Sequence, residues 1–550
     1  MRLSARAIHA AALLSFASAT SAIAQSSLPF GIQLTDATSE VSIGLLNGRA
    51  QAFSYVPATG AIAVRTDWRT NNAAMFNTAS SVKVLPWLAL HLKGSANITG
   101  NAEMERFNFN VPGCPGLTCQ TNSESTLVHA NRMELFAAAQ LIQNNNITLN
   151  ALAGFKRDFT KWQAFGGTRN FGAPTLPPGL NTSYEQTWST PYLGVSAAYT
   201  SGAWTLNGRV LGSAWATGED RIQDHLGSTD QTGKFAKSTF VGADLSAAYR
   251  LNASTSMTAG YGYQNWRTGK GTTTTTSNTG LVTTANDSAS ANNVSHMLSL
   301  GLKIDLNTPG SGADNRGPVR ASPWTGWYAG VTSGPDWLRA KWDTKSLGIP
   351  AGAPNAATAS QSLDDTGARL GGLAGYTWQT GGWVWGVEAD LSRSTASATK
   401  VGIPGTTTTA AQPLSSDAAI VSSGWDGSLR LRAGTELLPT LFPSLLIYGT
   451  AGVAFQQTTA QISCPGVSGT NSWCTADRDE KASKTRAGLT AGFGYEKQFA
   501  GNWFTRGEYR YTTTGTGADQ TYFATAPADA VTAKVDAASH RINFGLGYRF

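Results

Sequence analysis

The sequence predicts an all-β protein: two transmembrane antiparallel β-barrels in tandem, ten strands followed by eight. Three observations predict this fold. Apolar and polar residues alternate along many segments, tight turns alternate with long polar loops, and only 14% of the 550 residues are charged while 60 are glycine. A membrane barrel carries its apolar surface on every second residue, so the moderate mean hydropathy of −0.18 agrees with this fold.

The N-terminal segment "MRLSARAIHAAALLSFASATSAIAQ" has the features of a secretory signal. A basic start precedes a short apolar run, and Ala22-Ile23-Ala24 forms a small-x-small cleavage site. A transmembrane helix is the alternative, but serines interrupt the run and it is too short to span a bilayer. We therefore expect residues 1–24 to be a signal peptide that is removed near Ala24-Gln25, and the mature chain to be exported.

Ten candidate strands follow in the predicted first barrel, residues 25–306. Tight turns such as "QNNN" (143–146) and "TSGA" (200–203) alternate with long polar loops such as "GAPTLPPGLNTS" (172–183) and residues 271–292. This alternation is typical of a membrane barrel with its tight turns in the periplasm. The strands are expected near residues 40–56, 61–84, 87–109, 129–143, 147–171, 184–200, 203–224, 237–251, 256–270 and 293–306.

A Gly- and Pro-rich segment without periodicity, "NTPGSGADNRGPVRASP" at 307–323, is predicted to be a periplasmic linker between two barrels. Its length can span at most roughly 55 Å, enough to join two neighbouring barrels. A single eighteen-stranded barrel, wide enough for a porin-like aqueous channel, is the alternative. The second barrel is predicted over residues 324–550, with strands near 324–337, 366–380, 382–400, 424–438, 445–462, 484–499, 502–514 and 539–550.

Charged residues of the second half share one face of their strands. This face is predicted to point inward, where charges must be paired in a narrow lumen. The near balance of four basic and three acidic side chains favours a network that plugs the barrel over a charged pore. The members are Arg430, Arg432, Arg506, Arg510, Glu388, Asp390 and Glu508.

Four cysteines form two close pairs, Cys114 with Cys119 and Cys464 with Cys474, each in a turn-like stretch. In an exported chain, two local disulfides are the expected state. Zinc binding is the alternative, but no further Cys or His accompanies either pair. No other metal or cofactor is expected. The formal net charge of +7 is mild and without a basic cluster, which argues against nucleic-acid binding.

The chain ends on "SHRINFGLGYRF", in which every second residue is apolar up to Phe550. This resembles the terminal strand that outer-membrane barrels present to their assembly machinery. The second half as a whole resembles the small eight-stranded outer-membrane surface barrels of Gram-negative bacteria, related to the membrane domain of the OmpA family. The matching pieces are "WTGWYAGV", "GGLAGYTWQTGGWVWGVEADL", "LRLRAGTELLP", "YGTAGVAF", "GNWFTRGEYRYT" and "GLGYRF". The resemblance implies a membrane-anchored structural or surface role.

The first half resembles the omptins, ten-stranded outer-membrane aspartyl-type endopeptidases. The resemblance is carried by "VSIGLLNGRAQAFSYV", "RTDWRTNNAAM", "GNAEMERFNF", "ANRMELFAAAQLIQNNNITLNALAGFK", "AFGGTRNF", "YEQTWSTPYLGVSAAY" and "GLKIDL". It implies a water molecule held across the barrel mouth, with an Asp–His couple as general base on one side and an aspartate pair on the other. The carboxylates matter because water is a poor nucleophile until a base accepts its proton.

The omptin-equivalent positions carry other residues in this chain. The aspartate pair, which follows a methionine, matches Arg106 and Asn108, and neither can accept a proton at neutral pH. The Asp–His couple matches Ile222 and Asp224 without a gap; with one inserted residue it matches Gln223 and His225. Asp224 and His225 are neighbours, and neighbours on an extended strand point to opposite faces. The acidic residue that omptins use to select basic substrates matches Ala52.

These departures favour an outer-membrane protein whose protease site is degenerate, with a structural or surface-interaction role. One alternative is an omptin-type endopeptidase with a rearranged site built from Asp220, Asp224 and His225, with Glu105 as a further candidate. The other alternative is a porin formed by one wide barrel. The expected location is the Gram-negative outer membrane. The expected partners are its lipid and lipopolysaccharide, and the barrel assembly machinery through the strand ending at Phe550; surface ligands are not identified and nucleic acid is excluded.

Overall fold

The structure is a computed structural model, and it describes the chain in segments. These are residues 27–28, 32–33, 35–112, 114, 118–172, 175–176, 179–227, 229–252, 255–277, 281–305, 324–348, 352–406, 417–436, 444–466, 473–499, 502–515 and 517–550. The predicted signal peptide (1–24) and linker (307–323) lie outside the described residues. Within these segments, no helix is long and apolar enough to cross a membrane.

The first half forms one closed antiparallel sheet, the first barrel. Strands β5 and β6 both pair with β4 and β7, so they share one position around the barrel, and β12 and β13 share another. Pairing of β14 with β3 closes the sheet at the predicted ten positions. Its strands are β3 (Thr35–Tyr55), β4 (Ile62–Leu85), β5 (Leu88–Asn97), β6 (Asn101–Phe109), β7 (Thr118–Gln143), β8 (Ile147–Arg169), β9 (Leu180–Ser201), β10 (Trp204–Asp224), β11 (Thr229–Arg250), β12 (Thr255–Thr268), β13 (Gly271–Thr276) and β14 (Val282–Asp305). Before it, β1 (Ser27–Leu28) pairs with β2 (Ile32–Gln33).

The second half forms its own closed sheet, the second barrel. Both β17 and β18 pair with β19, and both β22 and β23 pair with β24, so eight positions are occupied. Pairing of β15 with β24 closes it. Among the described strands none joins the two sheets, so the single eighteen-stranded barrel is not formed. The strands are β15 (Gly326–Leu347), β16 (Ser360–Thr380), β17 (Trp383–Ser394), β18 (Ser397–Val401), β19 (Ala418–Glu436), β20 (Leu445–Cys464), β21 (Arg478–Phe499), β22 (Trp503–Thr514), β23 (Gln520–Tyr522) and β24 (Val531–Arg549).

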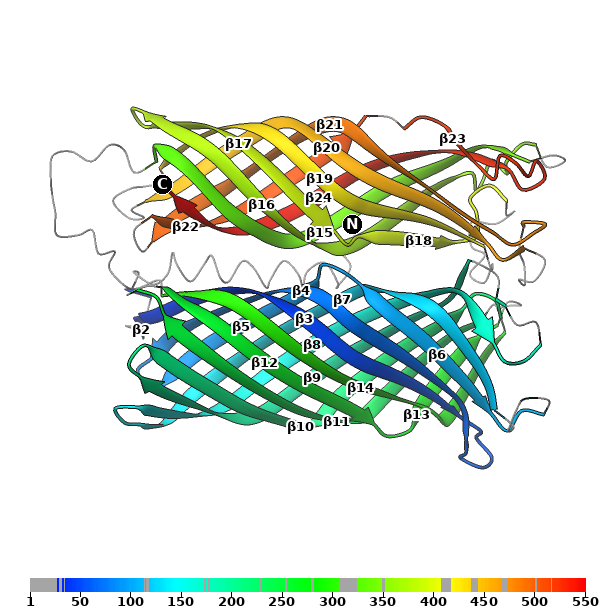
Figure 1. The fold of residues 1–550 in the computed structure, drawn as a ribbon, viewed down its shortest axis with the longest axis horizontal. Coiled ribbons are helices and arrows are strands. Elements are labelled where there is room, and N and C mark those ends of the chain that lie inside the picture. Colours follow the sequence, from blue (N-terminus) through cyan, green and yellow to red (C-terminus); the bar gives the residue numbers. More distant parts are fainter. Residues whose placement is uncertain are drawn as a thin grey trace.

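The two barrels lie side by side with their short turns at the same end, on the left of Figure 1. The β9–β10 and β16–β17 turns each contain a glycine with positive φ, Gly202 at 58° and Gly381 at 60°. Tight hairpins require this left-handed conformation, which glycine adopts without a steric penalty. Because each barrel has an even number of strand positions, its first strand begins and its last strand ends on the same side. The first barrel therefore ends at Asp305, and the second barrel begins at Gly326, both at the short-turn end.

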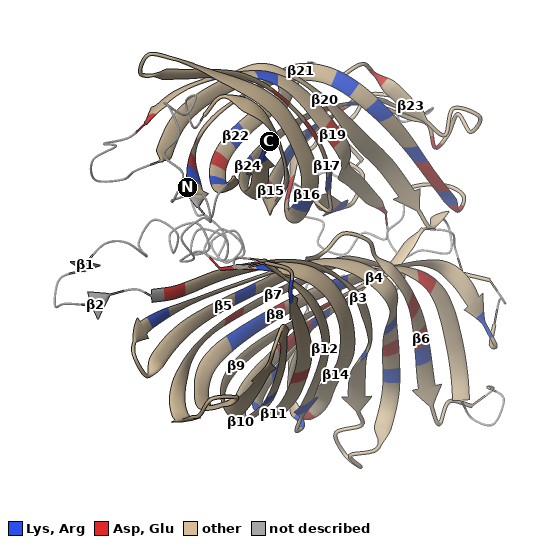
Figure 2. Ribbon diagram, turned by 60° about the vertical axis from the view of Figure 1, so that its left-hand side comes forward, with Lys and Arg blue, Asp and Glu red and all other residues tan. Residues whose placement is uncertain are grey.

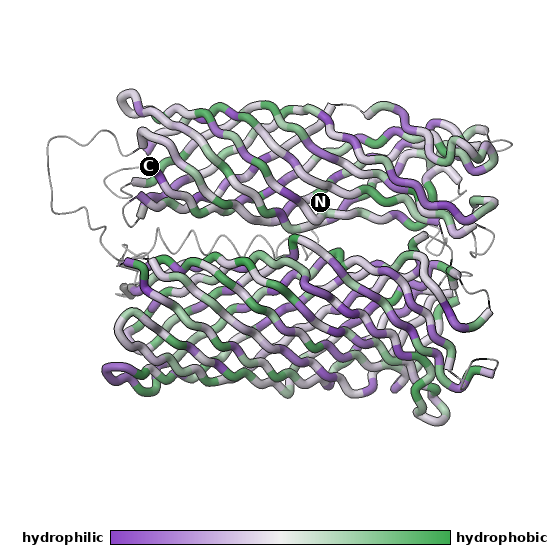
Figure 3. Tube along the Cα trace, viewed as in Figure 1, coloured by the Kyte–Doolittle hydropathy of each residue, from purple (hydrophilic) through white to green (hydrophobic). Residues whose placement is uncertain are grey.

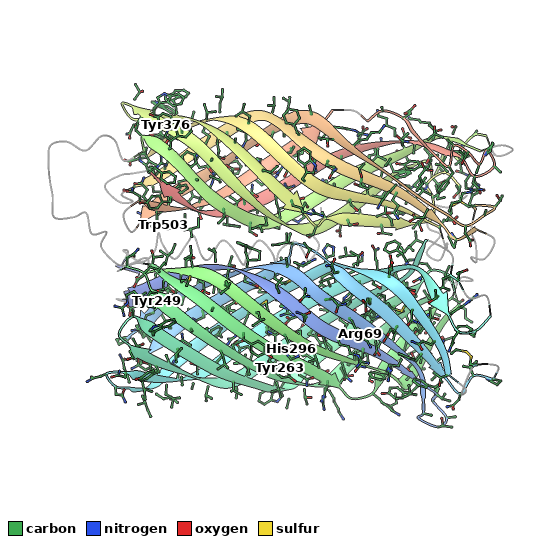
Figure 4. The ribbon with its side chains drawn as sticks, viewed as in Figure 1. Arg69, Tyr249, Tyr263, His296, Tyr376 and Trp503 are labelled. Atoms are coloured by element: carbon green, nitrogen blue, oxygen red, sulfur yellow. A yellow bond between two sulfur atoms is a disulfide. The ribbon has the colours of Figure 1, made fainter. Side chains whose placement is uncertain are left out.

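The outer walls carry an apolar band next to the short turns, and this band defines the membrane-spanning part. Large apolar side chains are exposed there, for example Leu193 at 55% and Leu300 at 68%. Aromatic pairs lie near the short turns, with Trp204–Tyr249 centroids 4.9 Å apart and Trp503–Tyr548 centroids 5.2 Å apart. Figure 4 places Tyr249, Tyr376 and Trp503 at this end, where interfacial aromatic residues are expected. Hydrophilic residues become denser toward the long-loop end of the first barrel (Figure 3).

Many strands continue beyond the apolar band, further than the sequence predicted. The expected loop at 271–292 was wrong: Gly271–Thr276 is β13, and β14 begins at Val282, so the two strands form a hairpin above the band. Backbone hydrogen bonds continue the ladder there although no lipid imposes an apolar face. Strand alternation in the sequence therefore revealed the membrane part better than the part outside it.

Charged side chains fill the lumen of the second barrel, as predicted (Figure 2 shows both signs along the strands). Glu388 is fully buried and accepts hydrogen bonds from Arg430, from Arg506 Nη1 at 2.6 Å and from Arg432 Nη1 at 3.1 Å. Glu508 bonds Arg430 at 2.9 Å. The sequence did not identify six further inward charges of this network, Asp336, Arg369, Asp426, Glu496, Arg541 and Arg549.

Both cysteine pairs are at disulfide distance, with Cα atoms 5.1 Å apart for Cys114–Cys119 and 5.9 Å apart for Cys464–Cys474. Asp417 lies beside the second pair, with ligand-type atoms of all three residues within 4.8 Å. Its carboxylate accepts the Trp473 N–H at 2.6 Å, and both sulfur atoms are engaged with each other. The zinc alternative is therefore not supported at this position.

Candidate functional site

The mouth of the first barrel holds the positions that the omptin resemblance singled out. On β6, Met104 is buried in the inner apolar cluster, so alternation places Arg106 and Asn108 on the same inward face. On the first strand, Ala52 belongs to the same cluster and leaves no acidic group at the mouth. These three positions therefore line the lumen.

Strand β10 supplies the opposing wall, four positions around the barrel from β6. Asp220 is buried, and Ile222 packs against the inner cluster, so residues 220, 222 and 224 point inward. The side chains of Gln223 and His225 point to the opposite face. Of the two predicted matches to the Asp–His couple, the ungapped one, Ile222 and Asp224, lies on the inward face.

An ion pair spans the mouth between these two walls. Arg106 Nη1 donates a hydrogen bond of 2.9 Å to Asp224 Oδ2, and the two side chains are 21% and 25% exposed. The other Asp224 oxygen accepts the Gly227 N–H at 2.8 Å. Burial alone would raise the pKa of Asp224, but the Arg106 charge and these hydrogen bonds hold it below its usual value. Asp224 is therefore an ionised carboxylate, and each of its oxygens accepts a hydrogen bond.

His225 does not join Asp224. Its Nε2 lies 3.0 Å from Ser183 Oγ, and its backbone N–H donates to Asn181 O at 2.8 Å. Burial lowers the pKa of the imidazole to about 4, so the ring is neutral at physiological pH. The two neighbours point to opposite faces, and no side-chain hydrogen bond couples them among the described contacts.

Glu105 also lies outside the mouth, because it faces the outer surface next to the inward-facing Met104. Its carboxylate forms an ion pair of 2.7 Å with Arg69 of β4, which Figure 4 labels on the wall of the first barrel. Glu105 therefore does not contribute to a rearranged site in the lumen.

Asp220 is the buried acid of the mouth. It accepts a hydrogen bond from the Tyr184 hydroxyl at 3.2 Å and from the Gly233 N–H at 3.1 Å. Burial raises the pKa of this carboxyl to about 7, despite both hydrogen bonds. Asp220 thus titrates near neutral pH, a few residues from Asp224, whose pKa is shifted the other way.

Three buried aromatic rings cluster in the lumen beside these acids. Trp68 stacks on Tyr184 at 5.6 Å, Trp162 stacks on Tyr184 at 5.7 Å, and all three rings are buried. Trp162 Nε1 donates to Thr70 Oγ1 at 3.1 Å. This aromatic cluster was not predicted from the sequence. Three aromatic residues at inward positions of three strands were the signal that could have revealed it. The mouth therefore combines two carboxyl groups with an aromatic cluster.

Comparisons with known proteins agree with this division of the chain. The Omptin family model matches residues 33–306, and the outer membrane protein beta-barrel domain model matches residues 317–550. The chain is 26% identical over 302 residues to the plasminogen activator of Yersinia pestis, covering 53% of this chain and 97% of that protein. It is 23% identical over 227 residues to the outer membrane protease OmpP of Escherichia coli, covering 39% and 72%. The second half is similar to the 25 kDa outer-membrane immunogenic protein of Brucella melitensis, 31% identical over 236 residues and covering 42% and 84%.

Proposed function

Residues 33–306 belong to the omptin family and residues 317–550 are an outer membrane protein β-barrel domain, so the chain is an outer-membrane protein, and we propose that its omptin-like site does not hydrolyse peptides. Its role is then structural or one of surface interaction. The observation that carries this proposal is the Arg106–Asp224 ion pair of 2.9 Å across the mouth.

The ion pair stands where the resemblance to omptins requires groups that accept a proton from water. A guanidinium cannot accept a proton, and Asn108 beside it is neutral and non-basic. Asp224 is ionised, but its oxygens already accept hydrogen bonds from Arg106 and Gly227. The base that general acid–base catalysis needs is thus absent from these positions.

A surface role fits the parts that project beyond the membrane. The β13–β14 hairpin extends above the apolar band and is rich in threonine. Polar side chains on such a projection are placed to contact molecules at the cell surface. Lipid and lipopolysaccharide are the partners proposed for the outward walls, and the assembly machinery for the strand that ends at Phe550.

A rearranged endopeptidase site is the second candidate, and Asp220 is the observation that favours it. Its pKa of about 7 matches what a general base needs at physiological pH. The carboxyl is 6% exposed and held by Tyr184 and Gly233, which leaves little room for a water molecule and a peptide. We therefore rank it second.

The test compares the native chain with a variant that carries the residues found in omptins. The purified full-length protein, in detergent with lipopolysaccharide, is incubated with a pool of basic peptides, and cleavage is followed by mass spectrometry. The same assay is run on the fourfold variant Arg106→Asp, Asn108→Asp, Ile222→Asp, Asp224→His. We expect no cleavage by the native protein and measurable cleavage by the variant.

Single substitutions separate the two candidates. If the native protein cleaves peptides and Asp220→Asn abolishes this cleavage, the rearranged site is correct and the proposal fails. If Asp224→Asn or His225→Ala abolishes cleavage, the proposal also fails. Glu219→Gln, at an exposed position of β10, is the matched control and should change nothing in any outcome.

A further inference from the structure

The outer wall of the first barrel carries buried polar side chains above the apolar band. His129 is 2% exposed although Ala130, its neighbour, packs in the inner cluster, so His129 points outward. Gln163 on β8 is likewise 4% exposed. These two side chains are buried because the second barrel packs against them.

Three hydrogen bonds join the two barrels at this wall. In the first, His129 Nε2 lies 3.1 Å from Asp365 Oδ2. Within the second barrel, the same oxygen also accepts the Ser397 N–H at 2.9 Å. In the second, Gln163 Nε2 donates to Thr399 Oγ1 at 3.0 Å. Each bond pairs a polar group that would otherwise be buried without a partner, which is costly in a desolvated interface.

The third bond lies at the rim of the first barrel's mouth. The Leu180 N–H donates to Ser463 Oγ at 2.7 Å, and both residues are fully buried. Leu180 forms an apolar cluster with Ala418 and Ile420 of β19, against which Phe165 packs. Polar and apolar contacts are therefore interleaved, as in a specific protein interface.

A further contact lies at the opposite, short-turn end of the barrels. Leu546 of β24 packs in a cluster with Ala37, Val82 and Ile304 of the first barrel. The barrels thus touch near both ends, consistent with the parallel arrangement in Figure 1. Contacts at two distant points define one relative orientation, whereas a single point would permit rotation.

We propose that the outward wall formed by β7, β8 and β9 above the membrane is a docking surface whose partner is the second barrel of the same chain. The second barrel binds it through β16, β18, β19 and β20. The tether raises the effective concentration of this partner to roughly the millimolar range, so contacts too weak for free proteins suffice here. A second copy of the chain has no such advantage.

Docking also supports the mouth of the first barrel. Asn181 follows Leu180, and its side chain donates to Gly166 O at 2.7 Å and Ser123 Oγ at 3.0 Å. Its backbone O accepts the His225 N–H at 2.8 Å, at the end of the strand that carries Asp224. The second barrel therefore contacts the rim that leads to Asp224. This inference is independent of whether the mouth of the first barrel hydrolyses peptides.

A disulfide tests the docking in the full-length protein. A Cβ built on Gly179 would lie 3.6 Å from Ser463 Cβ, within the range that a disulfide requires. The variant Gly179→Cys, Ser463→Cys also receives a protease site within 307–323, where cleavage separates the halves. After assembly in the outer membrane and cleavage, we expect most of the two halves to remain linked on a non-reducing denaturing gel and to separate on reduction.

Two controls fix the interpretation. Gly179→Cys alone reports exchange with the native Cys464–Cys474 pair, and Gly179→Cys with Ser483→Cys, an exposed position on β21, should give no link above that level. A link between two chains, seen at twice the mass before cleavage, would show that the surface takes a second copy and would overturn the proposal. Absence of any link above the single-cysteine control would overturn it as well.

A noncovalent measurement covers a failure of the cysteine variants to fold. The otherwise native protein with the cleavable linker is cut in mild detergent, and co-purification of the two halves is measured. We expect the halves to stay together, and Ile420→Glu to reduce co-purification at least tenfold because it places a charge in the apolar cluster. Thr485→Glu, exposed on β21, is the matched control. Separation of the native halves would contradict the proposal.

Discussion

The lumen of the second barrel and the mouth of the first barrel both contain arginine–carboxylate pairs, but the pairs differ in depth and number. In the second barrel, Glu388 is fully buried and contacts three arginines. At the mouth of the first barrel, one pair, Arg106 and Asp224, is about a quarter exposed. The first arrangement is a plug that the fold needs; the second is a single contact at the edge of solvent.

This difference indicates where charged residues can be substituted without unfolding the barrel. Removing one member of a buried network leaves its partners uncompensated in a low dielectric, so a single substitution there is strongly destabilising. A partly exposed pair can exchange its residues at a lower cost, because water solvates part of the group that remains. A catalytic site at the mouth could therefore be replaced by an ion pair while the barrel below it stayed intact.

The largest effect that tests this comparison is expected from Glu388→Ala. The substitution leaves Arg430, Arg432 and Arg506 with one carboxylate fewer, and we expect a loss of about 3–5 kcal/mol in the stability of the second barrel. Proteolysis along a urea series, with the two halves resolved on a gel, measures each barrel separately. The first barrel should be unaffected, and Asp364→Asn, at an exposed position of β16, should have no measurable effect. Equal loss in both barrels would contradict the account.

The next effect concerns pH and distinguishes two aspartates on one strand. The pKa of Asp220 is raised from 3.8 to about 7 by burial, so unfolding between pH 4 and 7 releases a proton that the folded state keeps. Stability from this group is therefore full below pH 4 and is lost as the pH rises to 7, by about 3 kcal/mol. Asp220→Asn should flatten this part of the pH profile of the first barrel.

Asp224 should show the opposite sign. Its folded pKa lies below 3.8, so its contribution is present above pH 4 and is lost as the pH falls through the folded value. Asp224→Asn should remove stability at pH 7 and none at the lowest pH. If both variants changed the profile in the same direction, the assignment of a neutral and an ionised acid at this mouth would be wrong.

The smallest effect is expected for the ion pair itself. Because both side chains are partly exposed, Arg106→Ala, Asp224→Ala and the double variant should give a coupling energy of about 0.5–1 kcal/mol in a double-mutant cycle. The same cycle on Arg430 and Glu508, both 2% exposed, should give a several-fold larger value. Similar values for the two cycles would remove the distinction between plug and mouth.

The barrels and the plug were predictable from the sequence for a physical reason. Lipid requires an apolar residue at every second position, and a narrow lumen requires balanced charge, so Glu388, Arg430 and Arg432 revealed their face by spacing alone. Strand β13 was missed because nothing outside the membrane imposes alternation on its run of threonines.

The site was predictable only in part. Alternation placed Arg106 and Asn108 inward, but the match to the Asp–His couple depended on whether one inserted residue was allowed after Trp215. The strand is irregular there, with register shifts between Ser213 and Gly218, and a regular alternation cannot be counted through such a region. The pair across the mouth joins residues 118 positions apart, and no local pattern encodes such a contact. The buried His129–Asp365 contact between the barrels is likewise invisible to a reading of either half alone.

Incorporation of oxygen from labelled water tests most directly whether the mouth of the first barrel hydrolyses peptides. The purified protein with lipopolysaccharide is incubated with a peptide pool in water labelled with ¹⁸O, and new C-termini are examined by mass spectrometry. We expect no ¹⁸O in any peptide product above the level found with protein-free micelles. Labelled C-termini whose formation is lost in Asp224→Asn or Asp220→Asn would contradict it, because they would show that these carboxylates still activate water at the mouth of the first barrel.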